Sequence, residues 1–309
     1  MDLITHILIG ILIIGLGFRR QGSLLTALLA SVLPDIDYIY YLFGADTFLR
    51  FHRGVTHGIF SLIIVPLLIG VLAKYRYERS FIYYSFIGFL GYGLHLLIDL
   101  MQEFGIKIFS PLDFNSYSLD ISFIFDPYII VIILMSILIR YLKKEKEVII
   151  TIVTFFVLIV YFDGRYYLKK ASEELLRKTM DEYVYRITPM PLGVFRWWFV
   201  SRSGDIMKTG IVDLFMERVI VLDTYQFIGV VAPPEIGENA YPEIFLSKDM
   251  PQVKNLLRFT KFPYAWVVKD GEKVIVKWTD LTYTSLPGQR MTATVVFEKG
   301  VVVGSKFRF

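Results

Sequence analysis

The stretch SFIYYSFIGFLGYGLHLLIDL, residues 80–100, is the most informative segment of this chain for predicting its fold. It is long and apolar enough to form a membrane-crossing helix, which needs ~20 apolar residues. Its end holds His95 and Asp99, which are four residues apart and therefore share one face of that helix. Ionisable side chains at membrane depth are costly unless they pair or bind something. The stretch thus predicts a membrane helix that contributes to a functional site.

The first half of the chain is far more apolar than the second. The 309 residues are 55% hydrophobic and their mean hydropathy is +0.53. Nearly all long apolar runs lie in residues 1–162, whereas residues 163–309 have the mixed composition of a soluble protein. We therefore expect two domains: an α-helical polytopic membrane domain over 1–162 and a small extramembrane β-rich α+β domain over 163–309.

About six apolar helices are expected in the first domain, and Pro34 should kink or end the second of them because proline removes a helix hydrogen bond. The apolar start of the chain lacks a basic leading region and a small-residue cleavage site, so we expect a retained helix. The six segments cover residues 3–18, 23–43, 56–73, 80–100, 127–142 and 147–162.

The loops between these segments indicate an orientation in the cytoplasmic (inner) membrane. Loops 19–20, 74–79 and 140–146 are rich in Lys and Arg, and such loops face the cytoplasm. Loops 44–55 and 101–126 are poorer in basic residues and should face outward. Six spans then place both termini, and with them the second domain, outside the cytoplasm.

The second domain shows the alternating, β-branched pattern of strands after a charged helix over 166–182. KDGEK (269–273) and EKG (298–300) predict tight hairpin turns, and a short helix is expected over 247–259. The predicted strands cover residues 194–200, 207–214, 218–222, 264–269, 273–279, 291–297 and 300–307.

Seven histidines and aspartates of the first domain are candidate metal ligands, and counting spans places all of them at one membrane face. Cysteine is absent, so a metal would be held by His and Asp, a ligand set that suits a divalent ion and zinc above all. The candidates are His6, Asp35, Asp37, His52, His57, His95 and Asp99.

Each candidate also has a structural interpretation when taken alone. His95 and Asp99 could be a buried structural pair, and His6 could bond a neighbouring helix. In the string PDID, Asp35 and Asp37 could be helix-end charges in water. Alternatively, one of these two aspartates acts as general base or bridging ligand, or orients a histidine.

The string FHRGVTH (51–57) places a guanidinium between two candidate ligands. Arg53 could anchor the helix at the membrane interface. Beside a metal, however, it would suit the oxyanion of a phosphate group and stabilise its developing charge. We therefore take Arg53 together with Asp35 and Asp37 as the candidate catalytic residues.

Taken together, the early His6, PDID (34–37), FHRGVTH and HLLID (95–99) resemble the YdjM-like inner-membrane metal-dependent hydrolases. GIKIFSP (105–111) and the Asp-Pro pair at 126–127 resemble the family too, and so, more loosely, do PMPLGVFRWW (189–198) and TDLTY (279–283). The family is distantly similar to zinc-dependent phospholipase C and to zinc nucleases that cleave single strands.

The resemblance implies that His95 and Asp99 form a ligand pair, and that His6, Asp35, Asp37, His52 and His57 complete a hydrolytic site. The soluble enzymes use two His-x-x-x-Asp pairs and more histidines than this chain has. We therefore expect one or two metal ions and not three.

These observations predict a membrane-embedded metal-dependent hydrolase. Its substrate would be a lipid-linked phosphate ester or phosphodiester at the outer membrane face, with membrane lipid as the partner and no nucleic acid. The alternative is a non-catalytic metal-binding membrane protein, either a transporter or an assembly or anchor protein. A transporter should place its polar residues near the bilayer midplane and open to both sides, whereas these gather at one face.

Overall fold

The computed structural model describes residues 3–77, 80–180, 184–226, 242–286, 288 and 290–308. Residue 79 of one basic loop and residues 181–182 of the predicted charged helix lie outside this described part. The chain forms two compact units. The first comprises residues 1–37, 53–170 and 191–194, and the second comprises 38–52, 171–190 and 195–309.

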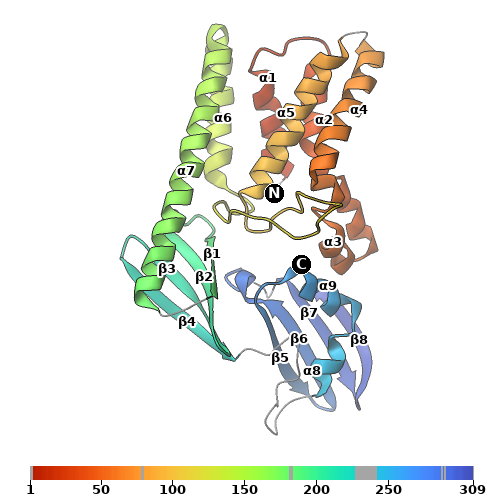
Figure 1. Ribbon diagram of the computed structural model, residues 1–309, viewed down its shortest axis with the longest axis vertical. Helices are drawn as coiled ribbons and strands as arrows, with labels where there is room; N and C mark the ends of the chain where they lie inside the picture. The colour runs from red at the N-terminus through yellow and green to blue at the C-terminus, as the bar shows by residue number, and fades with distance from the viewer. Residues whose placement is uncertain are drawn as a thin grey trace. The chain divides into compact units, whose positions relative to one another are not determined.

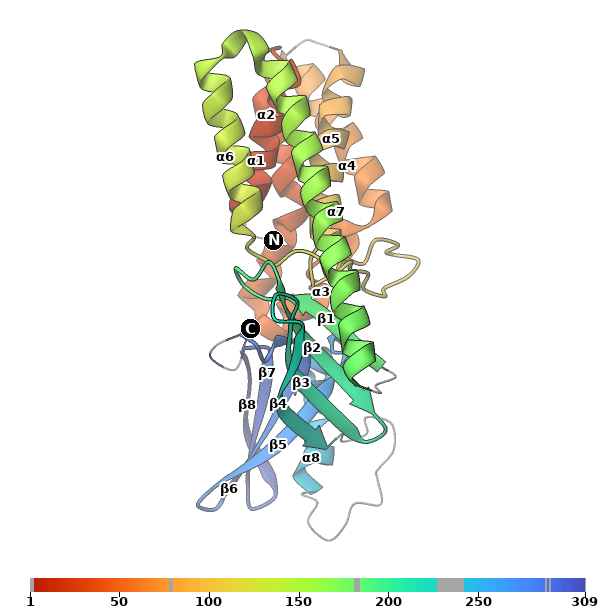
Figure 2. The same ribbon diagram turned by 90° about the vertical axis from the view of Figure 1, so that its left-hand side faces the viewer.

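The first unit is a bundle of apolar helices (Figures 1 and 2). Each of the six predicted apolar segments overlaps one of them. They are α1 (Leu3–Ile14), α2 (Ser23–Val32), α4 (Ile59–Tyr77), α5 (Phe81–Leu100), α6 (Pro127–Leu142) and α7 (Glu147–Thr179), the last of which continues into the second unit.

Four helical stretches in the described part of the chain are long and apolar enough to cross a membrane: 23–43, 59–77, 81–100 and 144–179. The expectation of six spans is therefore not supported. Helix α1 has 12 residues and α6 has 16, which is short of the ~20 that a bilayer requires. The sequence pattern located the apolar helices correctly, but it overestimated how many of them reach full length.

The predictions for Pro34 and for the domain boundary near residue 163 can both be compared with the helices. Helix α2 ends at Val32, and Pro34 lies in a 3-10 helix, η1 (Leu33–Phe43), as its missing N–H donor predicts. The apolar segment 147–162 and the charged segment after it form one continuous helix, α7, of 33 residues. The predicted domain boundary near residue 163 thus falls inside a helix.

Helix α1 lies at the centre of the packing in the first unit. Leu12 and Ile13 are fully buried, in one apolar cluster with Ile87 of α5 and Ile133 of α6. The outer faces of α4 and α7 carry large exposed apolar side chains, such as Leu68 (56% exposed). Apolar helices with apolar outer faces suit a lipid environment, where each backbone group is satisfied within its own helix.

The loop between α5 and α6 is hydrogen-bonded to the segment that leads into α4. Lys107 N donates to Arg53 O at 3.0 Å, and Ile59 N donates to Ile108 O at 2.8 Å. At the end of this loop the Asp126 side chain accepts hydrogen bonds from the first turn of α6 and so caps this helix.

The second unit holds two four-stranded antiparallel sheets with strand orders β1-β2-β3-β4 and β5-β6-β7-β8. This confirms a β-rich region after the helices. The strands are β1 (Val184–Pro189), β2 (Arg196–Ser203), β3 (Ile206–Asp213), β4 (Arg218–Gln226), β5 (Pro263–Asp270), β6 (Lys273–Asp280), β7 (Thr292–Glu298) and β8 (Val301–Arg308).

Local signals predicted most of these strands and missed one. Strand β1 was not predicted, because its six residues end in a proline and only pairing with β2 stabilises them. Both predicted hairpin turns are present, with positive φ at Gly271 and at the pair Lys299 and Gly300. The short helix predicted over 247–259 is present as α9 (Pro251–Phe259), and a further short helix, α8 (Pro242–Ser247), precedes it.

Two tryptophans fix the interior of the second unit. Trp198 of β2 donates its indole N–H to Leu281 O at 3.3 Å, in the turn of 3-10 helix that follows β6. Trp278 of β6 donates to Ser247 Oγ at 2.9 Å and holds α8. A further short helix, α3 (Ala45–Phe51), is tied to α9 by a hydrogen bond from Asn255 Nδ2 to Asp46 Oδ2 at 3.1 Å.

Candidate metal centre

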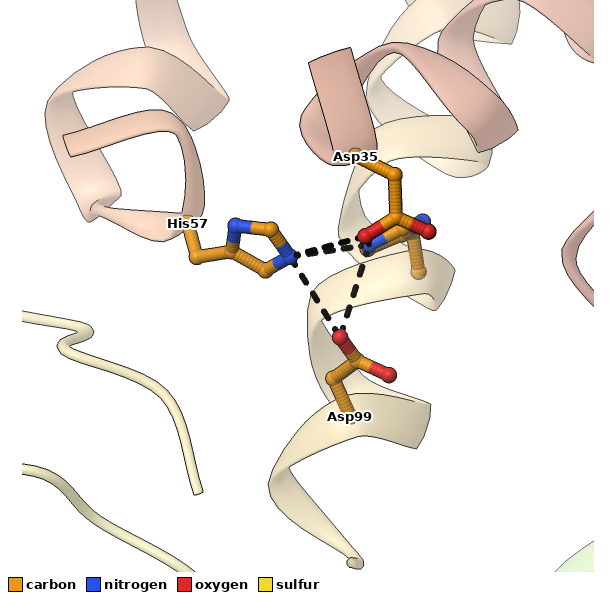
Figure 3. Close-up of side chains that lie close together, drawn as sticks. Asp35, His57 and Asp99 are labelled. Carbon is orange, nitrogen blue, oxygen red and sulfur yellow. Dashed lines mark hydrogen bonds and ion pairs between the residues drawn. The ribbon is translucent and has the colours of Figure 1, made fainter. Parts of the chain in front are cut away.

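Four of the predicted ligands meet inside the first unit, although they come from three separate segments. Asp35 lies in η1, His57 ends the short 3-10 helix η2 (Val55–His57), and His95 and Asp99 share α5 (Figure 3). Each offers one ligand atom, and these atoms lie within 4.8 Å of one another. His57, His95 and Asp99 are completely buried, and Asp35 is 8% exposed.

The spacing between these atoms matches that of the ligands around one small metal ion. His57 Nε2 lies 3.2 Å from His95 Nε2, 3.4 Å from Asp99 Oδ2 and 3.6 Å from Asp35 Oδ1. His95 Nε2 lies 3.5 Å from Asp99 Oδ2 and 3.8 Å from Asp35 Oδ1. A tetrahedral zinc ion with ligands at about 2.0–2.1 Å separates them by about 3.3 Å, so the four residues fit such an ion.

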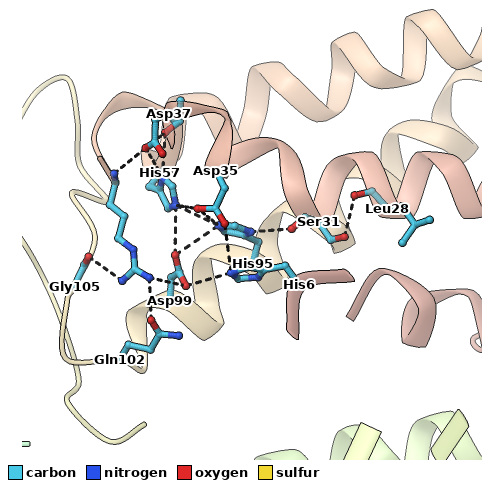
Figure 4. Close-up of polar contacts among 12 residues, drawn as sticks. His6, Leu28, Ser31, Asp35, Asp37, His57, His95, Asp99, Gln102 and Gly105 are labelled. Carbon is cyan, nitrogen blue, oxygen red and sulfur yellow. Dashed lines mark hydrogen bonds and ion pairs between the residues drawn. The ribbon is translucent and has the colours of Figure 1, made fainter. Parts of the chain in front are cut away.

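The orientation of His95 is set by its other ring nitrogen. His95 Nδ1 lies 2.8 Å from Ser31 O at the end of α2, and a carbonyl oxygen can only accept, so Nδ1 carries the proton (Figure 4). In a neutral imidazole the lone pair then sits on Nε2, which faces the other three ligands. Metal-binding histidines are commonly held by such a backbone contact.

Asp37 supports the centre from outside the group of four. Its Oδ2 accepts the backbone N–H of Arg53 at 2.8 Å and the hydroxyl of Thr56 at 2.9 Å, and it lies 3.5 Å from His57 Nδ1. Asp35 faces Nε2 of the His57 ring and Asp37 faces Nδ1 of the same ring, although only one residue separates the two aspartates. Of the two roles predicted for this pair, the geometry favours Asp35 as ligand and Asp37 as the residue that orients His57.

Arg53 is buried beside the centre and is 4% exposed. Its Nη2 lies 3.1 Å from Asp99 Oδ1 and donates to Gln102 Oε1 at 2.9 Å. The backbone φ of Arg53 is +54°, a rare conformation for a side chain of this size. The guanidinium therefore compensates Asp99 directly, and the predicted contact with an oxyanion stays a prediction.

His6 of α1 lies against the same carboxylates. Its ring stacks on His95 with a centroid separation of 3.7 Å, and its Nε2 lies 3.4 Å from Asp99 Oδ1 and 3.9 Å from Asp35 Oδ2. The ring is completely buried, and neither nitrogen has a hydrogen-bond partner among the described residues. Buried polar atoms without a partner are uncommon, and the two His6 nitrogens and Asp35 Oδ1 are orphaned atoms that a cation would satisfy.

His52, the seventh predicted ligand, follows α3 in the second unit. Its ring stacks on Phe48 with a centroid separation of 4.3 Å and meets Tyr38 edge-on at 4.9 Å. Its metal-binding role stays a prediction.

The electrostatics of the centre favour a bound cation. Burial of the His57 ring opposes its charged form, but the contacts with Asp35, Asp37 and Asp99 outweigh burial and raise the pKa of His57 to about 10. The carboxylates thus attract positive charge strongly. A metal ion that replaced this proton would satisfy the same demand, because metal ligands bind in their deprotonated form.

Close helix packing brings the ligands together. A Cβ added to Gly91 of α5 would lie 2.8 Å from Ala30 Cβ, and one added to Gly10 of α1 would lie 2.6 Å from Ser31 Oγ. Both distances are too short, so glycine is required where α1 and α5 approach α2. These contacts place His6 and His95 near the end of α2, from which η1 carries Asp35.

Sequence reasoning missed Gln102 and Ser31, which contact Arg53 and His95. The signal in the sequence was weak. Gln102 lies just beyond α5 and only three residues after Asp99, but Ser31 acts through its backbone carbonyl, which any residue would offer.

A buried His and Asp cluster at the end of apolar helices defines a membrane protein with a candidate metal-binding site. Residues 1–169, more than half of the chain, match the YdjM inner membrane protein family. The chain belongs to this family, which confirms the resemblance seen in the sequence.

The match with a curated relative covers less of the chain. It is 26% identical over 145 residues to the uncharacterized protein YfhP of Bacillus subtilis (strain 168). The aligned segment spans 42% of this chain and 43% of that protein. No solved structure matches the chain significantly.

Proposed function

We propose that the protein is a membrane-embedded hydrolase that uses a divalent metal, with zinc the best fit, to cleave a phosphate ester or phosphodiester of a lipid. The observation that carries this proposal is the spacing of His57, His95, Asp35 and Asp99 around one point inside a bundle of apolar helices. A bound divalent ion would act as a Lewis acid and lower the pKa of a bound water to ~7.

The residues of the chain would then have separate roles. His57, His95, Asp35 and Asp99 would hold the ion, with Asp35, the most exposed of the four, on the substrate side. Asp37 would hold His57 in place through Nδ1. Arg53 would balance the charge of Asp99 and add positive potential for a phosphate group.

A lipid substrate is supported by the residues that flank the centre. Ile36, next to Asp35, is 58% exposed, and Val55 and Ile59, each two residues from His57, are 52% and 41% exposed. Exposed apolar side chains beside the centre suit a substrate with hydrocarbon chains, which would enter there. We place this entrance at the outer membrane face, following the distribution of basic loops.

A non-catalytic metal site is the second candidate, and the burial of the centre favours it. Three of the four ligands are completely buried, and structural sites of four protein ligands are closed, whereas catalytic sites keep an open position. The orphaned nitrogens of His6 favour the hydrolase, because a closed four-ligand site would not need a further polar group beside it.

The test has two measurements on protein purified in lipid nanodiscs. Metal analysis should find at least one divalent ion per chain, and a panel of phospholipids and lipid phosphates should release head group or phosphate. His95→Gln should lose both, while Asp163→Asn, on the exposed surface of α7, should keep both. Wild-type protein without metal would refute the proposal, whereas bound metal without hydrolysis would support the structural site.

A further inference from the structure

The carboxylates of Asp35 and Asp99 each direct their two oxygens to different histidines. Asp35 Oδ1 and Asp99 Oδ2 face His57 and His95. Asp35 Oδ2 and Asp99 Oδ1 are instead the oxygens nearest to His6 Nε2, at 3.9 Å and 3.4 Å. The two carboxylates therefore lie between two sets of imidazole nitrogens, as carboxylates that bridge two metal ions do.

We propose that His6 Nε2, Asp35 Oδ2 and Asp99 Oδ1 form a second divalent-cation position, bridged to the first by both carboxylates. The inference rests on the metal centre of the proposed function and goes beyond it. His6 is the independent observation: its ring is completely buried, lies among the carboxylates (Figure 4), and has no hydrogen-bond partner among the described residues for either nitrogen.

A structural role alone does not explain why a histidine occupies position 6. Stacking on His95 accounts for the position of the ring, but an apolar aromatic ring would stack equally well. Burying an imidazole costs free energy when its hydrogen bonds to water are not replaced, and the carboxylate oxygen nearest to His6 Nε2 is 3.4 Å away. A cation between His6 and the two carboxylates removes this cost.

The net charge of the cluster indicates that one divalent ion binds more readily than two. Asp35, Asp37 and Asp99 carry three negative charges and Arg53 carries one positive charge, so the cluster with neutral histidines has a net charge of −2. One divalent ion balances this charge, and a second leaves an excess of +2 in a buried site, which is unfavourable without an anion.

Arg53 adds positive charge beside the second cation position and so weakens the binding of an ion there. Its Nη2 lies 3.1 Å from Asp99 Oδ1, the same oxygen that would bind the second ion. We infer that the second ion binds weakly by itself and tightly together with a phosphate group. Two cations ~3.5–4 Å apart that share a phosphoryl group are the arrangement that many phosphate-transferring enzymes use.

The experiment counts Mn²⁺ ions per chain by equilibrium dialysis, with and without inorganic phosphate, and records the EPR spectrum of each sample. Wild type should bind one ion without phosphate and two with phosphate, and the second should give the spin-coupled signal of an ion pair. His6→Phe keeps an aromatic ring against His95 and should bind one ion in both conditions. His6→Gln, which also removes the imidazole, is measured in parallel and replaces His6→Phe as the test variant if His6→Phe does not fold.

The outcomes separate the two proposals. A second ion in His6→Phe or His6→Gln, or a wild type that binds one ion whether or not phosphate is present, would overturn the second position and leave the first intact. A second ion that binds wild type equally well without phosphate would overturn the anion requirement. Wild type without any ion would refute the metal centre itself.

Discussion

The Nε2 atoms of His57 and His95 face each other at 3.2 Å, although 38 residues separate the two histidines in the chain. Two unprotonated imidazole nitrogens repel each other at this distance, so a cation must lie near them or one of the two Nε2 atoms must carry a proton. The surrounding carboxylates of Asp35 and Asp99 make either state favourable.

Loss of either of these two histidines should abolish metal retention. His57→Gln or His95→Gln removes one of four ligands, and we expect metal affinity to fall by more than about 100-fold, since loss of an outer partner alone costs ~10–100-fold. The affinity is measured by competition with a zinc chelator on purified protein. Asp163→Asn is the matched control, and unchanged affinity in the His95 variant would contradict the assigned centre.

Asp37→Asn should weaken the centre without removing the ion. The amide still accepts a hydrogen bond from Arg53 N or from Thr56 Oγ1, but it no longer carries the charge that stabilises the His57 ring. We expect metal affinity to fall by ~10–100-fold while the number of ions per chain stays the same. Complete loss of metal would instead make Asp37 a ligand.

Arg53→Met should destabilise the metal-free protein more than the metal-loaded protein. The substitution leaves Asp99 without its guanidinium partner, and breaking a buried pair costs ~3–5 kcal/mol. A bound cation compensates part of this loss. Thermal unfolding with and without a chelator measures the difference, and an equal effect in both states would show that Arg53 acts only on the loop that it contacts through Gly105.

Gly91→Val should lower both stability and metal content, because the added side chain pushes α5 away from α2. Its Cβ would lie 2.8 Å from Ala30 Cβ and 3.1 Å from Ala27 O. Such overpacking costs ~1–3 kcal/mol. Gly93→Ala is the matched control on the same helix, since its Cβ would come no closer than 3.7 Å to Leu62. Unfolding temperature and metal content together give the readout, and normal values for Gly91→Val would contradict the packing argument.

The second unit should lie outside the cytoplasm. The chain has no cysteine, so a single introduced cysteine reports its location without background. A membrane-impermeant maleimide applied to intact cells should label Lys299→Cys, in the β7–β8 turn, but not Lys144→Cys, in the basic loop before α7. Both side chains are exposed, so the reverse labelling pattern would invert the proposed topology.

Sequence patterns alone located the apolar helices, seven of the eight strands in the described part of the chain, and the four candidate ligands that meet in the first unit. These features depend on local patterns: the apolar runs, the Pro34 break in α2, the Lys-Gly turn at 299–300, and the four-residue spacing of His95 and Asp99. Such patterns act within a few residues and are visible without any partner.

The remaining features depend on contacts between residues that are far apart in the sequence. The tertiary structure placed Asp35 at Nε2 and Asp37 at Nδ1 of the His57 ring, held His95 through the carbonyl of Ser31, and left the nitrogens of His6 without a hydrogen-bond partner among the described residues. It also showed that α1 and α6 are shorter than a full span, and that strand β1 forms only because β2 pairs with it. None of this is encoded in residue spacing, because the approach of α1, α5 and η1 determines which atoms face one another.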